Sequence, residues 1–211
     1  FNTMHTTHGR AITYATGVKL AKPELTVFVV TGDGDATAIG GNHFIHAARR
    51  NLDLKVIIIN NHIYGMTGGQ ASPTTPQGKR GTTAPFGQME RPFDIAALAV
   101  AAGASFVART TTYHVHECER LIRKAIGNHG FSVVEIIAAC PTSFGRQNKQ
   151  GQPMDLMDWQ RDSSVSLSKA KDMSTEELED AIVTGVFADR EQPEFGAQYL
   201  ALVERLKEAG R

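Results

Sequence analysis

The sequence predicts an α/β domain with an open, mainly parallel sheet and helices on both faces, followed by a helical C-terminal extension. Residues 25–30 and 55–59 form short apolar runs rich in β-branched side chains. Such runs are typical of strands buried on both faces of a parallel sheet. Between them, residues 38–51 place apolar side chains at helical spacing. Strand, helix and strand together predict one βαβ unit, whose crossover is right-handed.

The same alternation of helices and strands continues to residue 137. Residues 93–102 are alanine-rich, and residues 113–127 have an amphipathic pattern, so both are predicted to be helices. Apolar runs at 105–108 and 131–137 are predicted to be strands. Repeated alternation of this kind indicates a sheet covered by helices rather than an all-β or all-α domain.

The composition changes after about residue 145, where a mixed polar stretch begins. We therefore expect residues 1–145 to form the α/β domain and residues 146–211 to form the extension. Ser174 and Glu177 have the spacing of a capping box, which predicts a helix from there to about Val186. A terminal helix is expected over residues 193–209.

Bulk composition restricts the class of protein. The chain has 211 residues, 41% hydrophobic, and carries 22 basic and 22 acidic side chains. This balance does not support nucleic-acid binding. No apolar run approaches the roughly 20 residues that span a bilayer, so we expect no membrane segment. Two cysteines, Cys118 and Cys140, make a disulfide framework improbable and favour a reducing, cytoplasmic location. Because residue 1 is Phe, we expect further residues to precede it.

Two polar motifs follow the first two predicted strands. Gly32-Asp33-Gly34-Asp35 comes directly after the first strand, and Asn60-Asn61 ends the second. Each motif alone is better explained as a turn or a strand end. Because one βαβ unit separates them, both should reach the carboxyl edge of the sheet, where open α/β sheets bind ligands. Together they therefore predict a binding site.

The residue types suit a metal diphosphate. Glycines let backbone N–H groups approach an anion closely, and the following helix offers its positive N-terminal end. Asp33 and Asn61 offer oxygen atoms of the kind that Mg²⁺ prefers, and the carbonyl of Ile63 can add a third.

The spacing of these motifs resembles that of thiamine-diphosphate enzymes. The longer context resembles the β subunits of 2-oxoacid:ferredoxin oxidoreductases over about residues 5–146. The resemblance is carried by His8-Gly-Arg-Ala11, by residues 32–51, by Asn60 to Thr75, and by Cys140-Pro-Thr-Ser-Phe-Gly-Arg146. Thr67-Gly-Gly-Gln70 and Gly145-Arg-Gln-Asn148 are more similar to the 2-oxoglutarate enzymes than to the broad-specificity ones.

The resemblance implies a fold of the diphosphate-binding type and a set of site residues. Asp33, Asn61 and the Ile63 carbonyl would hold Mg²⁺. The thiamine diphosphate site would contain His8, Gly32, Asp33, Gly34, Asp35, Asn61, Ile63, Gly65, Met66 and Thr67. Cys140 would be one of four ligands of a [4Fe–4S] cluster, with the other three upstream of residue 1. Cys118 is expected to be structural, and His43 and His46 to be ordinary side chains of a helix.

The resemblance also implies oxidative decarboxylation of a 2-oxoacid to acyl-CoA and CO₂, with electrons passing through the cluster to ferredoxin. The partners would be an α subunit, ferredoxin, the 2-oxoacid and coenzyme A. Because the α subunit supplies the activating glutamate in this family, no acid or base is assigned here. Three alternatives remain at this point: a pyruvate or broad-specificity enzyme, a fragment of a self-contained thiamine decarboxylase, and a non-catalytic scaffolding subunit.

Residues 64–92 contain no periodic segment and are rich in Gly, Thr, Ser, Pro and Gln. A long loop directly after a strand is usually functional or disordered, and its position favours a function. A buried second carboxylate of a substrate needs cations or N–H donors. Gly68, Gly69, Lys79 and Arg80 are candidates for that role.

Overall fold

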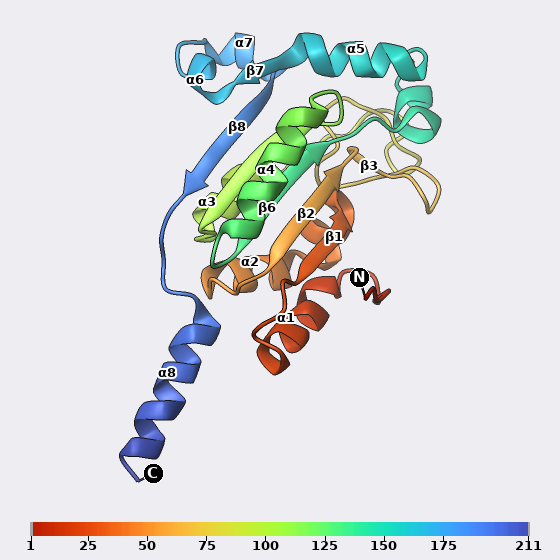
Figure 1. Cartoon of the computed structure of the whole chain (residues 1–211). Helices are drawn as coiled ribbons and strands as arrows, with labels where there is room; N and C mark the ends of the chain where they lie inside the picture. Colours follow the sequence, from red (N-terminus) through yellow and green to blue (C-terminus); the bar gives the residue numbers. More distant parts are fainter. Residues whose placement is uncertain (1, 211) are drawn as a thin grey trace.

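The computed structural model describes residues 2–210, and its centre is a six-stranded sheet in the order β1-β2-β6-β5-β8-β7. Strands β1, β2, β6 and β5 are parallel to one another. β8 runs antiparallel to β5, and β7 is parallel to β8. The predicted mainly parallel sheet is therefore confirmed, and its carboxyl edge lies at the top of Figure 1.

Up to residue 137 the predicted strands and helices are present, with small shifts at their ends, whereas the helix over residues 11–21 and the hairpin over residues 63–71 were not predicted. The sheet strands are β1 (Phe28–Gly32), β2 (Lys55–Asn60), β5 (Phe106–Thr111), β6 (Ser132–Ile137), β7 (Ser164–Ser166) and β8 (Ile182–Asp189). A separate hairpin pairs β3 (Ile63–Tyr64) with β4 (Gln70–Ala71). The α-helices are α1 (Ala11–Ala21), α2 (Gly41–Arg49), α3 (Ile95–Ala101), α4 (Val115–Gly127), α5 (Pro153–Ser163), α6 (Leu167–Ala170), α7 (Thr175–Glu179) and α8 (Phe195–Glu208). Two π-helical turns are η1 (Asp35–Ile39) and η2 (Pro141–Gly145).

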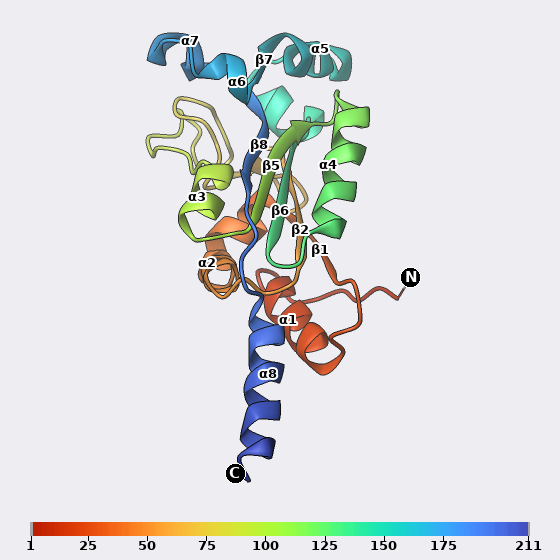
Figure 2. The same ribbon diagram turned by 60° about the vertical axis from the view of Figure 1, so that its left-hand side comes forward.

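Helices cover both faces of the sheet, as predicted. α2 and α3 lie on one face and α4 lies on the other, as Figure 2 shows with the sheet nearly edge-on. The larger core cluster joins the first face to α1, and Phe44 of α2 meets Phe131 edge-on, with ring centroids 5.8 Å apart. Leu121 and Ala125 of α4 pack in a second cluster against the other face. The central strands are buried on both sides, which explains their continuous apolar sequences.

The C-terminal extension differs from the predicted polar segment plus two helices. Its polar segment contains α5, β7 and α6, none of which was predicted. The capping box at Ser174 and Glu177 is present, but the helix that it starts ends at Glu179. The predicted continuation to Val186 is wrong, because Ile182–Asp189 forms β8 and pairs with β5. A capping box favours only the first turn, whereas this β-branched and aromatic run gains backbone hydrogen bonds from an open sheet edge.

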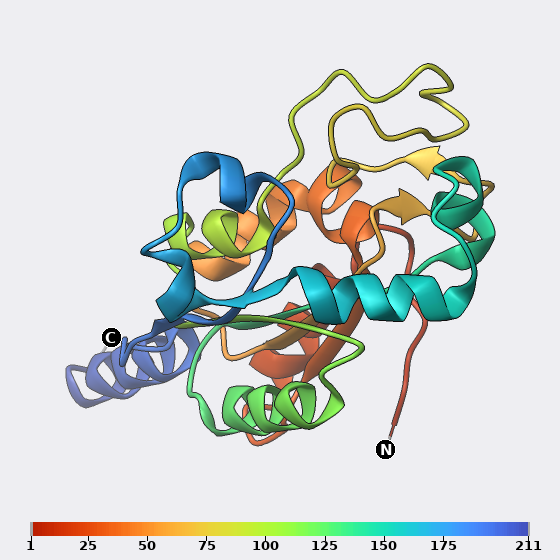
Figure 3. The same ribbon diagram turned by 90° about the horizontal axis from the view of Figure 1, so that it is seen from above.

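The rest of the extension crosses the sheet edge and then leaves the body. Figure 3 shows α5 passing above the carboxyl ends of the strands. The terminal helix is confirmed as α8, which projects away from the sheet in Figures 1 and 2. The division at residue 145 stays a prediction, although β7 and β8 complete the same sheet. Among residues 2–210, no helix has the length and apolarity needed to cross a membrane.

A line of buried polar side chains runs across the carboxyl half of the sheet. Asn60 on β2 donates its amide to Glu135 on β6 at 2.8 Å. Glu135 also accepts from Arg109 Nε on β5 at 2.7 Å, and Arg109 forms an ion pair with Asp94 before α3. Glu135 is 2% exposed. Although burial lowers the pKa of Arg109, the two carboxylates outweigh it and raise the pKa above its ordinary value. The guanidinium group therefore stays charged within the fold.

Removing the central carboxylate of this line is expected to destabilise the protein strongly. Glu135→Ala leaves the Arg109 guanidinium with only its more exposed partner, and breaking a buried ion pair typically costs about 3–5 kcal/mol. Glu119→Ala is the matched control, because it breaks an exposed pair with Arg123 on α4 that is worth at most about 1 kcal/mol. Denaturant unfolding of the full-length chain measures both. Similar small losses in the two variants would contradict the assigned role of Glu135.

Candidate functional site

The site lies where β1 and β2 end at the carboxyl edge of the sheet. These strands are parallel neighbours, with Gly32 opposite Ile59. The residues that follow them, Asp33 and Asn61, therefore lie side by side, and the Asn61 backbone N–H lies 3.5 Å from Asp33 Oδ1. The structure thus brings together the two motifs that the sequence analysis placed at this edge.

The side-chain amide of Asn61 lies between two oxygens at this position. The amide atom of Asn61 that faces the site lies 3.2 Å from Asp33 Oδ1 and 2.7 Å from the Ile63 carbonyl oxygen. An amide nitrogen there would donate to both oxygens. An amide oxygen there, which also accepts from the Ile63 N–H at 3.4 Å, would complete a triangle of three oxygens. Adjacent ligands of an octahedral Mg²⁺ ion at about 2.1 Å lie about 3.0 Å apart, and the separations of 3.2 and 2.7 Å from the Asn61 amide atom suit that ion.

Asp33 is buried, and only one of its carboxylate oxygens faces the triangle. The other oxygen, Oδ2, accepts hydrogen bonds from Ser72 and Thr74, each at 2.6 Å. The sequence analysis did not assign either hydroxyl to the site. The available signal was their position in the long polar loop after the second strand, which the structure folds back over Asp33.

Gly34 allows a close contact between the first motif and Tyr64. A side chain at Gly34 would collide with the Tyr64 ring, whose hydroxyl donates to the Gly34 carbonyl at 3.1 Å. Burial raises the pKa of Tyr64, and the charges of Asp33 and Asp35 raise it further, so the hydroxyl keeps its proton for this bond. A side chain at Gly32 would instead enter open space. The backbone at Gly32 is therefore accessible to a ligand.

Asp35 fastens the N-terminal segment to the site. Its carboxylate accepts from the Gly9 N–H at 2.6 Å and from the Thr31 hydroxyl at 2.5 Å, and it contacts Nδ1 of the His8 ring. The His8 ring meets Tyr64 edge-on at a centroid distance of 6.1 Å. The predicted neighbours His8 and Asp35 are thus brought together. Because the Asp35 carboxylate already has these partners, the backbone of Asp35 is the part of the residue that remains to bind an anion.

Residues 65–67 continue the same edge. Met66 is fully exposed, and Thr67 donates to Gln70 at 2.7 Å. Gly65 approaches Cys140, since a Cβ atom built on Gly65 would lie 3.5 Å from the Cys140 sulfur. Cys140 itself is buried in a small cluster with Ile63 and Phe144. The two cysteines are free, and Cys118 lies on α4, where burial raises the pKa of its thiol.

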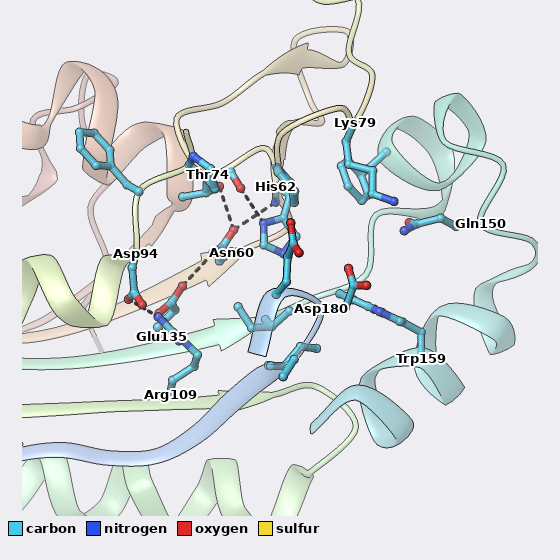
Figure 4. Close-up of a pocket in the computed structure, with 18 residues that line it drawn as sticks. Asn60, His62, Thr74, Lys79, Asp94, Arg109, Glu135, Gln150, Trp159 and Asp180 are labelled. Carbon is cyan, nitrogen blue, oxygen red and sulfur yellow. Dashed lines mark hydrogen bonds and ion pairs between the residues drawn. The ribbon is translucent and has the colours of Figure 1, made fainter. Parts of the chain in front are cut away.

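A cavity of about 350 Å³ adjoins the site on the side of the buried polar line. Figure 4 shows His62 at its centre, with Asp180 and Trp159 of the extension opposite. His62 has a backbone φ of +62°, and its Nδ1 lies 3.0 Å from the Thr74 carbonyl oxygen. Burial lowers the pKa of His62, which favours the neutral ring. The sequence analysis did not identify this cavity, because residues from the extension form one of its walls.

The two motif glycines are expected to respond differently to substitution. Gly34→Ala forces the new methyl group against the Tyr64 ring, and overpacking of this kind costs about 1–3 kcal/mol. Gly32→Ala places the same methyl group in open space and should change the free energy of unfolding by less than about 0.5 kcal/mol. Denaturant unfolding of the full-length chain compares them. Equal losses in both variants would mean that the Tyr64 contact does not require a glycine.

The chain is similar to known proteins of one family. Residues 1–136 match the family of thiamine pyrophosphate enzymes, C-terminal TPP-binding domain. The KorB subunit of 2-oxoglutarate synthase from Methanocaldococcus jannaschii is 54% identical over 98% of this chain and 76% of its own length. Its counterpart from Methanothermobacter thermautotrophicus is 53% identical over 96% of this chain and 71% of its own length.

A solved structure is similar over nearly the whole fold. The 2-oxoglutarate:ferredoxin oxidoreductase from Magnetococcus marinus, determined with 2-oxoglutarate, coenzyme A and succinyl-CoA bound, superposes with a TM-score of 0.84. It is 33% identical in sequence, and the match covers 97% of this chain and 70% of that one. This chain therefore belongs to the family of 2-oxoglutarate synthase KorB subunits, the β subunits of the 2-oxoacid:ferredoxin oxidoreductases.

Proposed function

We propose that this chain holds thiamine diphosphate and Mg²⁺ in an enzyme that oxidatively decarboxylates 2-oxoglutarate to succinyl-CoA and CO₂ and passes the electrons to ferredoxin. The main support for the proposal is that Asp33, Asn61 and the Ile63 carbonyl lie together at the sheet edge of a domain that matches the thiamine pyrophosphate-binding family. When bound, thiamine diphosphate supplies the electron sink that decarboxylation of a 2-oxoacid requires.

Each part of the edge has a separate task in this proposal. Asp33, Asn61 and Ile63 would hold Mg²⁺, and the backbone from Gly32 to Asp35, which opens to free space at Gly32, would bind the diphosphate. The helical segment that starts there directs its positive end to the same place. The turn of the β3–β4 hairpin would line the site with Gly65, Met66 and Thr67. The N-terminal segment would contribute His8.

The acid–base work is assigned to the α subunit. Both carboxylates of the Gly-Asp-Gly-Asp motif are already engaged. Asp33 accepts from two hydroxyl groups and faces the cation site, and Asp35 binds His8, Gly9 and Thr31. Neither is available to activate a cofactor, which supports the expectation that a glutamate of the α subunit does so. The chain alone would then bind cofactor but not turn over.

Fewer of the candidate substrate-binding groups are available than the sequence predicted. Gly68 and Gly69 both have positive φ angles, as expected for a glycine turn, but the Gly69 N–H donates to the Tyr64 carbonyl at 2.8 Å. That group is therefore not available to a second carboxylate. Gly68, Arg80 and Lys79, which lines the cavity, remain the proposed contributions of this chain. A cytoplasmic location also stays a prediction.

Activity of the reconstituted complex tests the function. With the full-length β chain, its cognate α subunit, coenzyme A and a viologen or ferredoxin acceptor, we expect kcat/KM for 2-oxoglutarate to exceed that for pyruvate at least about 10-fold. Asp33→Ala should abolish turnover, because it removes a charged ligand from the proposed cation site. Equal or better turnover of pyruvate would contradict the substrate, and turnover by the β chain alone would contradict the assignment of acid–base work to the α subunit.

Cys140 is proposed as one ligand of a [4Fe–4S] cluster, which four thiolates hold. The Cys140 sulfur lies beside Gly65, and the side chain packs with Ile63 and Phe144. An iron–sulfur cluster bound to this sulfur would therefore adjoin the cofactor site. Residues 2–210 provide no group of three or more metal-binding side chains, so the other ligands would come from outside this range.

Cys140→Ser is expected to remove or convert the cluster in the full-length αβ complex while thiamine diphosphate binding survives, because the thiol is not part of the cation triangle. Iron analysis and electron paramagnetic resonance measure the cluster, and calorimetry measures cofactor binding. Cys118→Ser on α4 is the control and should leave both unchanged. A normal cluster in the Cys140→Ser protein would make Cys140 an ordinary core residue.

A further inference from the structure

The two oxygens of the Asp33 carboxylate have different surroundings. Oδ1 faces the Asn61 amide and, beyond it, the Ile63 carbonyl. Oδ2 lies 2.6 Å from the hydroxyl oxygens of both Ser72 and Thr74. Asp33, Ser72 and Thr74 are each 2% exposed. Water therefore does not compete for Oδ2, and the loop provides its hydrogen bonds.

The short distances favour Asp33 as the acceptor of both hydroxyl protons. Each hydroxyl has one proton to donate, and a contact of 2.6 Å between a hydroxyl and a carboxylate is typical of a charge-assisted hydrogen bond. The Thr74 hydroxyl also reaches the Asn60 side-chain oxygen and the Ser72 hydroxyl, each at 3.0 Å. Both contacts are longer than the one to Asp33, and the Asn60 oxygen already accepts from the His62 N–H at 3.1 Å. Oδ2 is thus the acceptor of two hydroxyl donors.

The loop that carries these donors is itself fixed to the cation site. Ser72 N–H donates to the Thr75 hydroxyl oxygen at 2.8 Å, and Thr75 N–H donates to the Ser72 carbonyl at 3.0 Å. The Thr75 hydroxyl donates in turn to the His62 carbonyl at 2.6 Å. Residues 72–75 therefore hold both the Asp33 carboxylate and the backbone between Asn61 and Ile63. This arrangement leaves little freedom for the carboxylate to rotate.

We infer that Ser72 and Thr74 are positioning residues that restrict Asp33 to coordination through one oxygen and thereby favour Mg²⁺ over Ca²⁺. The inference rests on the proposed function, since it concerns the cation of that site. Mg²⁺ requires six oxygens at about 2.1 Å in near-ideal octahedral positions, which a one-oxygen carboxylate satisfies. Ca²⁺ accepts six to eight oxygens at about 2.3–2.6 Å and readily takes both oxygens of a carboxylate. With Oδ2 held by two hydroxyls, that second contact is not available.

The test compares two cations in the cofactor-free, full-length αβ complex. Calorimetry measures thiamine diphosphate binding as Mg²⁺ or Ca²⁺ is varied, for wild type, Thr74→Val, Ser72→Ala and the double variant. Thr74→Val keeps the shape of the side chain and removes the hydroxyl. Thr74→Ser keeps the hydroxyl and is the matched control. Circular dichroism and thermal unfolding of each variant report whether the fold is retained.

We expect loss of the hydroxyls to weaken Mg²⁺-dependent binding about 10- to 100-fold, as loss of groups that orient metal ligands commonly does. Ca²⁺-dependent binding should weaken less, because the released oxygen can now contact the larger ion, so the Mg²⁺/Ca²⁺ preference falls. Thr74→Ser should keep the wild-type preference. Equal losses for both cations, or no loss, would overturn the inference and leave the proposed function standing. If wild type shows no cation-dependent cofactor binding, the proposed function fails instead.

Discussion

The parallel pairing of β1 with β2 is the constraint on which the site depends. Parallel neighbours end at the same edge of a sheet, so two motifs that are distant in sequence become adjacent there. The register, Gly32 opposite Ile59, sets which atoms meet: the carboxylate of Asp33, the amide of Asn61 and the carbonyl of Ile63. A shift of register by one residue would turn each side chain to the opposite face and separate this set.

A buried carboxylate at such an edge must be compensated, and the molecule compensates it from several directions. The loop after β4 supplies hydroxyl donors to Asp33. Farther along the edge, Asn60, Glu135 and Arg109 form a hydrogen-bonded line over three neighbouring strands. Buried polar groups are tolerated only when their partners are present. The edge consequently combines buried polar side chains with satisfied hydrogen bonds, and it is the part proposed to hold a charged ligand.

The C-terminal extension adds strands to the sheet and a wall to the cavity. β8 covers the exposed edge of β5, and α5 with the α7–β8 connection forms the wall of the cavity beside the cation site (Figure 4). The match to the thiamine pyrophosphate domain ends at residue 136, whereas the similar solved structure covers 97% of the chain. The extension is therefore a feature that this chain shares with an oxidoreductase of its own family.

Local sequence patterns were sufficient for most of the fold and for the centre of the site. β-branched runs, helical spacing and the Gly-Asp-Gly and Asn-Asn motifs act over a few residues, so β1, β2, α4, Asp33 and Asn61 could be placed without coordinates. Three features depend on contacts that form only in the folded chain, and two of these contacts join residues that are distant in sequence. β8 is a strand because β5 offers it an edge, although the capping box before it favours a helix. Ser72 and Thr74 reach Asp33 across about 40 residues of chain, as their separations of 39 and 41 show. The Gly69 N–H, expected to face a substrate, is used by the Tyr64 carbonyl within the hairpin. Such partners depend on how the chain closes on itself, and hydrogen bonding and packing in the folded state select them.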